Sequence, residues 1–125
     1  VSQASFSPPG ITVAVAKDRA IESFMQVNKT FVINILREDN FQNMFRHFLK
    51  RFAPGADRFA DVDIIKDLAN GGPVLSDALA FLDCKVISRL ETPDHWIIYG
   101  IVENGSVSDL TCKTAVHHRK VANHY

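Results

Sequence analysis

The chain has 125 residues, of which 46% are hydrophobic and 22% charged, and its 14 basic side chains equal its 14 acidic ones. This balance is typical of one globular domain and argues against disorder or a coiled coil. Zero net charge gives no global field to attract nucleic acid or an anionic membrane surface, and no apolar run approaches the roughly 20 residues of a membrane span. We expect one domain over residues 1–125 that binds neither nucleic acid nor membrane.

Four elements are predicted in the first third of the chain. Ser7-Pro8-Pro9-Gly10 predicts a stiff turn, because proline fixes φ and glycine relaxes the exit. Residues 11–16 form an apolar run typical of a buried strand, and Asp18 stands where it could cap a short helix through Met25. The β-branched run at 30–36 predicts a second strand.

The middle of the chain predicts its clearest helix. Apolar side chains recur at helical spacing over residues 41–52. They are Phe41, Met44, Phe45, Phe48, Leu49 and Phe52, and the opposite face carries Arg46, His47, Lys50 and Arg51. Pro54-Gly55 should end this helix. Residues 54–77 are predicted to form a loop, with the strongest turn signal at 70–73.

The last third predicts sheet. Residues 82–90 alternate as in a half-buried strand, with Asp83 on the polar side, while 95–103 are apolar on both faces and should form a central strand. Asn104-Gly105 is typical of a type I′ hairpin turn, and 116–120 predict a final short strand. Together these elements predict a mainly β, Greek-key antiparallel barrel with helical insertions.

The sequence contains no recognisable metal or nucleophile motif. His117 and His118 are adjacent, so on a strand they point to opposite faces, and HExxH, CxxC and GxSxG patterns are absent. Cys84 lies mid-strand on the apolar side, where a thiol packs rather than reacts. Two cysteines, Cys84 and Cys112, are too few for a disulfide framework, and no signal peptide is visible, so we expect reduced thiols and a cytoplasmic protein.

Three places could bind an anion or a ligand. The strand ending near Ala16 leads into Lys17-Asp18-Arg19 and a helix start, where exposed amides and two cations could hold a phosphate; a solvated corner is the alternative. His95 follows Asp94 between two strands, either as a loop anchor paired with that carboxylate or as a functional residue. The basic face of the 41–52 helix has the same two interpretations, a solvated surface or a binding surface.

Segments along nearly the whole chain resemble the flavin reductase-like split-barrel family, and most closely the C-terminal flavin reductase domain of cyanobacterial flavodiiron proteins. They are SQASFSPPGITVAVAKDRAIES at 2–23, FVINIL at 31–36, HFLKRFAPGADRF at 47–59, DALAFLDCKV at 77–86, DHWIIYGIVENG at 94–105 and HHRK at 117–120. The resemblance implies non-covalent FMN or FAD, NAD(P)H as electron donor, a homodimer, and electron delivery to oxygen in a longer protein. Hydride transfer is then the cofactor's chemistry and needs no catalytic side chain. The alternatives are a non-catalytic electron-relay module and a dimerising remnant without cofactor.

The resemblance also implies site residues. Gln3 and Ser5 would line the flavin ring, and Pro8 and Pro9 would turn the chain beneath it. The same comparison assigns the flavin phosphate to Lys17 and Arg19, places Asn34 near the site and puts His95 at the nicotinamide.

Three departures from the family pattern are visible. Ser7 replaces a common Asn, and Pro93 replaces a usual Gly in the turn before Asp94-His95. The family also begins several strands earlier, whereas this chain begins at Val1, so we expect an N-terminally truncated barrel that is open at one edge.

Overall fold

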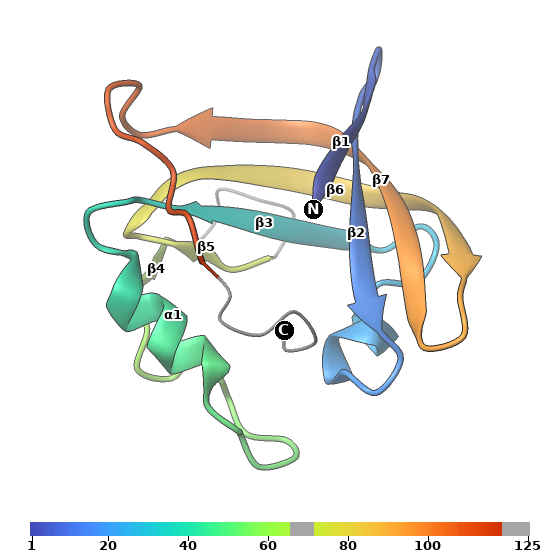
Figure 1. Cartoon of the computed structure of the whole chain (residues 1–125), viewed down its shortest axis with the longest axis horizontal. Coiled ribbons are helices and arrows are strands. Elements are labelled where there is room, and N and C mark those ends of the chain that lie inside the picture. The colour runs from blue at the N-terminus through green and yellow to red at the C-terminus, as the bar shows by residue number, and fades with distance from the viewer. Residues whose placement is uncertain (66–71, 119–125) are drawn as a thin grey trace.

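The computed structural model describes residues 1–65 and 72–118. Its centre is a five-stranded antiparallel sheet in the order β1-β2-β7-β6-β3, which coils so strongly that β2 runs across the direction of β3 (Figure 1). The strands are β1 (Ser2–Phe6), β2 (Pro9–Ala16), β3 (Thr30–Leu36), β6 (Ala78–Glu91) and β7 (His95–Val107). The predicted mainly β, antiparallel architecture is confirmed.

β7 is the central strand of the sheet, as the sequence predicts. It pairs with β2 on one side, from Ala16↔His95 to Gly10↔Ile101, and with β6 on the other. The face of β7 that carries Ile98 is buried, with Ile98 0% exposed, and the opposite face is half-buried, which agrees with an apolar run on both faces. The strand continues to Val107, four residues beyond the predicted end.

The predicted hairpin turn at Asn104-Gly105 is wrong. Both residues lie inside β7, where Asn104 pairs with Asp83 and Gly105 with Leu82 of β6. Gly105 is required by a close approach rather than by a turn, because a Cβ there would lie 2.7 Å from the carbonyl oxygen of Phe81.

A register shift changes the burial predicted for β6. The pairing with β7 slips between Asp83 and Cys84, so these consecutive residues are 2% and 0% exposed, and the prediction of Asp83 on a polar face is wrong. The predicted burial of the Cys84 thiol is confirmed. Burial, with a smaller contribution from the charge of Asp83, raises the pKa of this thiol to about 11.

The helix predicted over 18–25 is a short 3₁₀ helix, η1 (Ala20–Phe24). Its N-cap residue is Arg19, whose side chain makes no capping hydrogen bond, so the predicted cap at Asp18 is wrong. Met25 follows η1 and is 3% exposed. It packs in the core cluster with Val15, Val86 and Ile98, so η1 closes one face of the sheet.

The predicted long helix is α1 (Phe41–Leu49), which ends before the expected residue 52 because Lys50 is extended. The chain then folds back, so that the ring of Phe59 lies 5.2 Å from Phe48 and the ring of Phe52 lies 5.5 Å from His47. Within α1 itself no residue is buried.

The remaining segments differ from prediction in small ways. The predicted loop over 54–77 contains the two-residue strands β4 (Ile64–Ile65) and β5 (Val74–Leu75), while the break at Asn70-Gly71 lies outside the described residues. Of the predicted strand at 116–120, residues 116–118 are irregular and 119–120 lie outside the described residues. Among the described helices, none has the length and apolar character that a membrane crossing needs.

Candidate functional site

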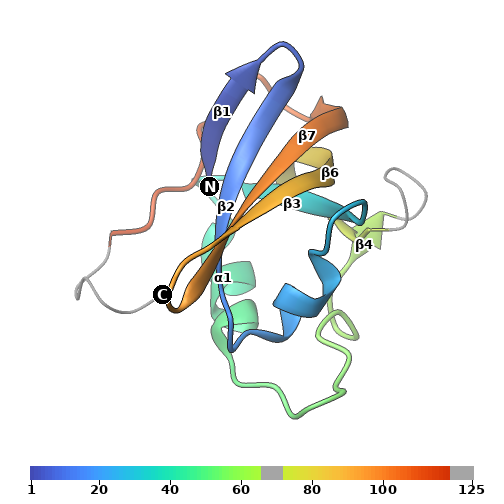
Figure 2. The ribbon, with the colours of Figure 1, turned by 90° about the vertical axis from the view of Figure 1, so that its right-hand side faces the viewer.

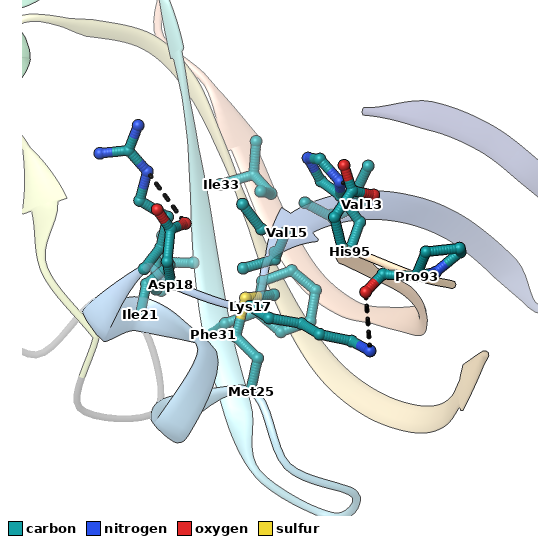
Figure 3. A pocket seen from close by; sticks show the side chains of 15 residues that line it. Val13, Val15, Lys17, Asp18, Ile21, Met25, Phe31, Ile33, Pro93 and His95 are labelled. Atoms are coloured by element: carbon teal, nitrogen blue, oxygen red, sulfur yellow. Dashed lines mark hydrogen bonds and ion pairs between the residues drawn. The ribbon is translucent and has the colours of Figure 1, made fainter. Parts of the chain in front are cut away.

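A cleft with a volume of about 1040 Å³ lies between β2 and β3, near the end of β2 that leads into η1 (Figure 3). Its floor is apolar and is formed by Val13, Val15, Ile21, Met25, Phe31 and Ile33. Its polar mouth is formed by Lys17, Asp18, Arg19, Pro93, Asp94 and His95. A mostly apolar cavity with a few polar groups at one end is the usual form of a small-molecule site.

The cleft exists because β1 covers only half of β2. The β1–β2 pairing runs from Phe6↔Pro9 to Ser2↔Thr12, whereas Val13–Ala16 pair only with β7 in the part of the chain that is described. The outer edge of β2 beyond Thr12 therefore faces the cleft.

Lys17 is at the mouth but already has partners. Its Nζ donates to Glu91 Oε1 at 2.7 Å and to the carbonyl oxygen of Pro93 at 3.4 Å, and it lies 5.5 Å from the ring centre of Trp96. The side chain is 32% exposed, so its stem is covered while its charge reaches the mouth. Lys17 thus presents a cation whose charge is balanced by a carboxylate.

Arg19 is more open, with 65% of its side chain exposed and its Nε 3.9 Å from Asp18 Oδ1. The corner amides are less available than the sequence suggested, since Lys17 N donates to the Asp94 carbonyl and Arg19 N to the Ala16 carbonyl. The corner therefore offers two cations rather than a row of open amides. The assignment of a phosphate to Lys17 and Arg19 stays a prediction.

His95 lines the cleft and is also anchored, so the two roles considered from sequence are compatible. Its Nδ1 lies 2.8 Å from Asp94 Oδ1, and this hydrogen bond, with the charge of the ring, holds the pKa of Asp94 below its ordinary value. Thr92 clamps the turn, because its hydroxyl donates to the His95 carbonyl and accepts from the His95 amide. The Pro93 that replaces the family's glycine contributes its carbonyl to Lys17.

The residues predicted at the flavin ring lie at the other end of β2. Ser5 Oγ donates to the Pro8 carbonyl at 2.7 Å and lies 3.0 Å from the hydroxyl of Tyr99. Gln3 pairs with Ile11 across the hairpin, Pro9 pairs with Phe6, and the Ser7–Pro8 peptide bond is cis. None of the four predicted ring residues is among the residues that line the cleft.

The predicted cofactor residues therefore fall into two groups that the structure does not bring into one cavity. Figure 2 shows the β1–β2 turn at one end of β2 and η1 at the other. From Gly10 to Lys17 the strand spans about 23 Å, at roughly 3.3 Å per residue.

Asn34 has a structural partner. Its Nδ2 donates to the Pro73 carbonyl at 3.0 Å, and its Oδ1 accepts from the Leu75 amide at 2.8 Å. Both ends of the amide thus hold β5 against β3. Asn34 does not line the cleft, so any contact with a flavin stays a prediction.

Sequence reasoning missed the charged layer around Trp96. Arg89 lies with its guanidinium 4.1 Å from the Trp96 ring and is paired with Glu22, while Lys17 and Glu91 meet beside the same ring. Arg89 and Glu91 are two residues apart on β6 and so share a face, but the strand predicted from sequence ended at residue 90, before Glu91. In the described residues, no group of three or more His, Cys, Asp or Glu side chains is arranged to hold a metal ion.

The comparison with protein families decides the relationship. The model of the flavin reductase like domain matches residues 1–123. The chain belongs to the flavin reductase-like family. It is 63% identical over 125 residues to "Diflavin flavoprotein A 1" of Synechocystis sp. (strain ATCC 27184 / PCC 6803 / Kazusa), covering 100% of this chain and 22% of that protein. The chain thus spans about a fifth of the length of its diflavin relative, and the resemblance stated from sequence is confirmed.

Solved structures support the family fold. NADH:FAD oxidoreductase SgcE6 of Streptomyces globisporus C-1027 superposes with a TM-score of 0.80 at 27% identity, over 90% of this chain and 66% of that one. A structure of the same enzyme in complex with NAD and FAD fragments gives a TM-score of 0.76 at 25% identity, with the same coverage. The predicted split-barrel fold of this flavin reductase-like domain is confirmed.

Proposed function

We propose that the chain binds FMN or FAD and reduces it with NADH or NADPH, as one domain of a longer protein that passes the electrons to oxygen. The family match over residues 1–123 carries this proposal. The complex of SgcE6 with NAD and FAD fragments supports the choice of ligands, since that protein is a structural neighbour of this chain.

The cleft fits a flavin in chemistry. An apolar floor suits a fused aromatic ring, and two cations at the mouth suit a phosphate. We assign the phosphate to Lys17 and Arg19, and the ring to the apolar floor beside the edge of β2 that β1 leaves uncovered beyond Thr12. FMN and FAD both carry a phosphate on the ribityl chain, so the assignment applies to either.

A bound flavin supplies the hydride-accepting ring, and the protein supplies binding and orientation. The floor residues Val13, Val15 and Phe31 exclude water from the ring. We assign His95, which is fixed by Asp94 and Thr92, to the nicotinamide donor.

We further propose that the protein is a cytoplasmic homodimer. This oligomeric state is the one that the resemblance to the family implies. Both described cysteines are free, which is compatible with a reducing compartment.

The test is spectroscopic and kinetic. Purified protein should show flavin absorbance, release FMN or FAD on denaturation, and oxidise NADH or NADPH at a rate that depends on that flavin. Bound flavin without nicotinamide oxidation would favour the electron-relay alternative. Protein that stays colourless with added FMN and FAD would reject flavin binding and leave the dimerising remnant.

A further inference from the structure

Lys17, one of the two cations assigned to the phosphate, already forms an ion pair within the protein. Lys17 Nζ lies 2.7 Å from Glu91 Oε1, and Glu91 sits beside the mouth of the cleft with 63% of its side chain exposed. Asp18 in turn lies beside Arg19. With Asp94 included, three carboxylates lie beside the two cations at the mouth.

The donor capacity of Lys17 is also partly used. An ammonium has three N–H donors, and Glu91 and the Pro93 carbonyl accept from two of them. A phosphate that bound the third would stand close to the Glu91 carboxylate, and like charges at such separations repel even in a solvent-like dielectric.

We propose that Glu91 is a specificity-determining residue that competes with the ligand's phosphate for Lys17, and so lowers the preference of the site for phosphorylated over unphosphorylated flavin. The inference rests on the proposed function, since it requires that a flavin phosphate reaches Lys17.

Glu91 could instead favour phosphate binding by holding Lys17 in position. The other contacts of Lys17 argue against this role. The Pro93 carbonyl and the Trp96 ring restrain the lysine without Glu91. Trp96 is itself held from the β6 side by the guanidinium of Arg89, which Glu22 pairs. Removing the Glu91 charge therefore leaves the ammonium in place and removes a competitor.

The experiment compares FMN with riboflavin, which lacks the phosphate. Dissociation constants are measured by flavin fluorescence titration of apo-protein for the wild type and Glu91→Gln. We expect FMN to bind roughly two- to five-fold tighter to Glu91→Gln, with riboflavin unchanged, which is the scale of an exposed ion pair. Glu38→Gln is the matched control, since Glu38 is exposed beyond the end of β3 and the change in net charge is the same.

A second pair of proteins, both carrying Lys17→Gln, separates competition for Lys17 from an effect of net charge on FMN binding. There, Glu91→Gln should no longer change the ratio of FMN to riboflavin affinity. The role of Glu91 would be overturned if Glu91→Gln alone left the ratio of FMN to riboflavin affinity unchanged or lowered it. It would also be overturned if Glu38→Gln gave the same gain in FMN affinity. Either result would leave flavin binding itself intact. A wild type that binds neither flavin would instead reject the proposed function, and this inference with it.

Discussion

The two ends of β2 differ in how their polar groups are used. At the end that begins with Pro9, β1 covers the strand, and Ser5 is bonded to the Pro8 carbonyl and to Tyr99. At the end that leads to Lys17, the outer edge beyond Thr12 has no strand neighbour in the described residues, and a cleft of about 1040 Å³ lies beside it.

The difference shows that one strand can serve a structural and a ligand-binding purpose in succession. At the covered end the hydroxyl groups form hydrogen bonds within the protein, so replacing these residues should first affect stability. The open end has exposed charge and space, so replacing its cations should first affect ligand affinity. The following variants test this division, from the largest expected effect to the smallest.

The largest effect is expected at the open end. Replacing Lys17 and Arg19 together with Ala should weaken FMN binding by about 1.5–3 kcal/mol, the scale of hydrogen bonds to charged groups. Stability should change little, because exposed ion pairs such as Lys17–Glu91 contribute about 0–1 kcal/mol. Fluorescence titration with FMN and riboflavin gives the affinities, and denaturant unfolding gives the stability.

The matched control for this variant is Lys50→Ala/Arg51→Ala, which removes two charges just beyond α1. It should leave FMN affinity unchanged. Equal FMN affinity in the Lys17/Arg19 variant and the wild type would end the phosphate assignment.

At the covered end, Gly10→Ala should lower the free energy of unfolding by about 1–3 kcal/mol, as overpacking does. A Cβ at this position would come closest to the hydroxyl of Ser5, and it would lie 2.7 Å from Tyr99 Cε2 and 2.8 Å from the Tyr99 hydroxyl oxygen. Urea denaturation followed by Trp96 fluorescence measures the change. Ser7→Ala in the same turn is the control and should stay within about 0.5 kcal/mol of the wild type. Equal stability of both variants would show that the Ser5 and Tyr99 side chains move aside without cost.

Local sequence signals predicted the elements that depend on local sequence. The β-branched run gave the strand Thr30–Leu36 with its bounds, and helical spacing gave the start of α1 at Phe41. Asn104-Gly105 predicted a turn that does not form. Its pairing partners, Asp83 and Leu82, lie about twenty residues earlier, and a dipeptide pattern contains no information about such distant partners.

The same limit applies to the site. Lys17, Arg19 and His95 were predicted as site residues, and the structure brings all three to one cleft. The partner that determines the charge of Lys17 is Glu91, 74 residues later, and that contact follows from the β2-β7-β6 order of the sheet. The contact of Ser5 with Tyr99 spans 94 residues and is equally invisible in sequence.

A smaller effect is expected for Ser5→Ala. It removes the bonds to Tyr99 and the Pro8 carbonyl and should cost about 0.5–1.5 kcal/mol of stability. A double-mutant cycle with Tyr99→Phe separates the two bonds, because only the Tyr99 bond appears as coupling. FMN affinity equal to that of the wild type would keep Ser5 in the structural group, whereas a loss of affinity larger than the loss of stability would move it to the ligand.

The smallest effect concerns the turn at the mouth of the cleft. The hydrogen bond from His95, and the charge of its ring, hold the pKa of Asp94 below its ordinary value of 3.8. A carboxyl whose pKa is lower in the folded protein stabilises it above the unfolded value, and that contribution is lost as the pH falls through the folded pKa. Between pH 5 and pH 2 the melting temperature of the wild type should therefore fall more steeply than that of Asp94→Asn, with the difference confined to the region below about pH 4. Parallel curves for the two proteins would show that the Asp94–His95 contact does not stabilise the fold, whereas the Thr92 bonds to the His95 backbone would be unaffected.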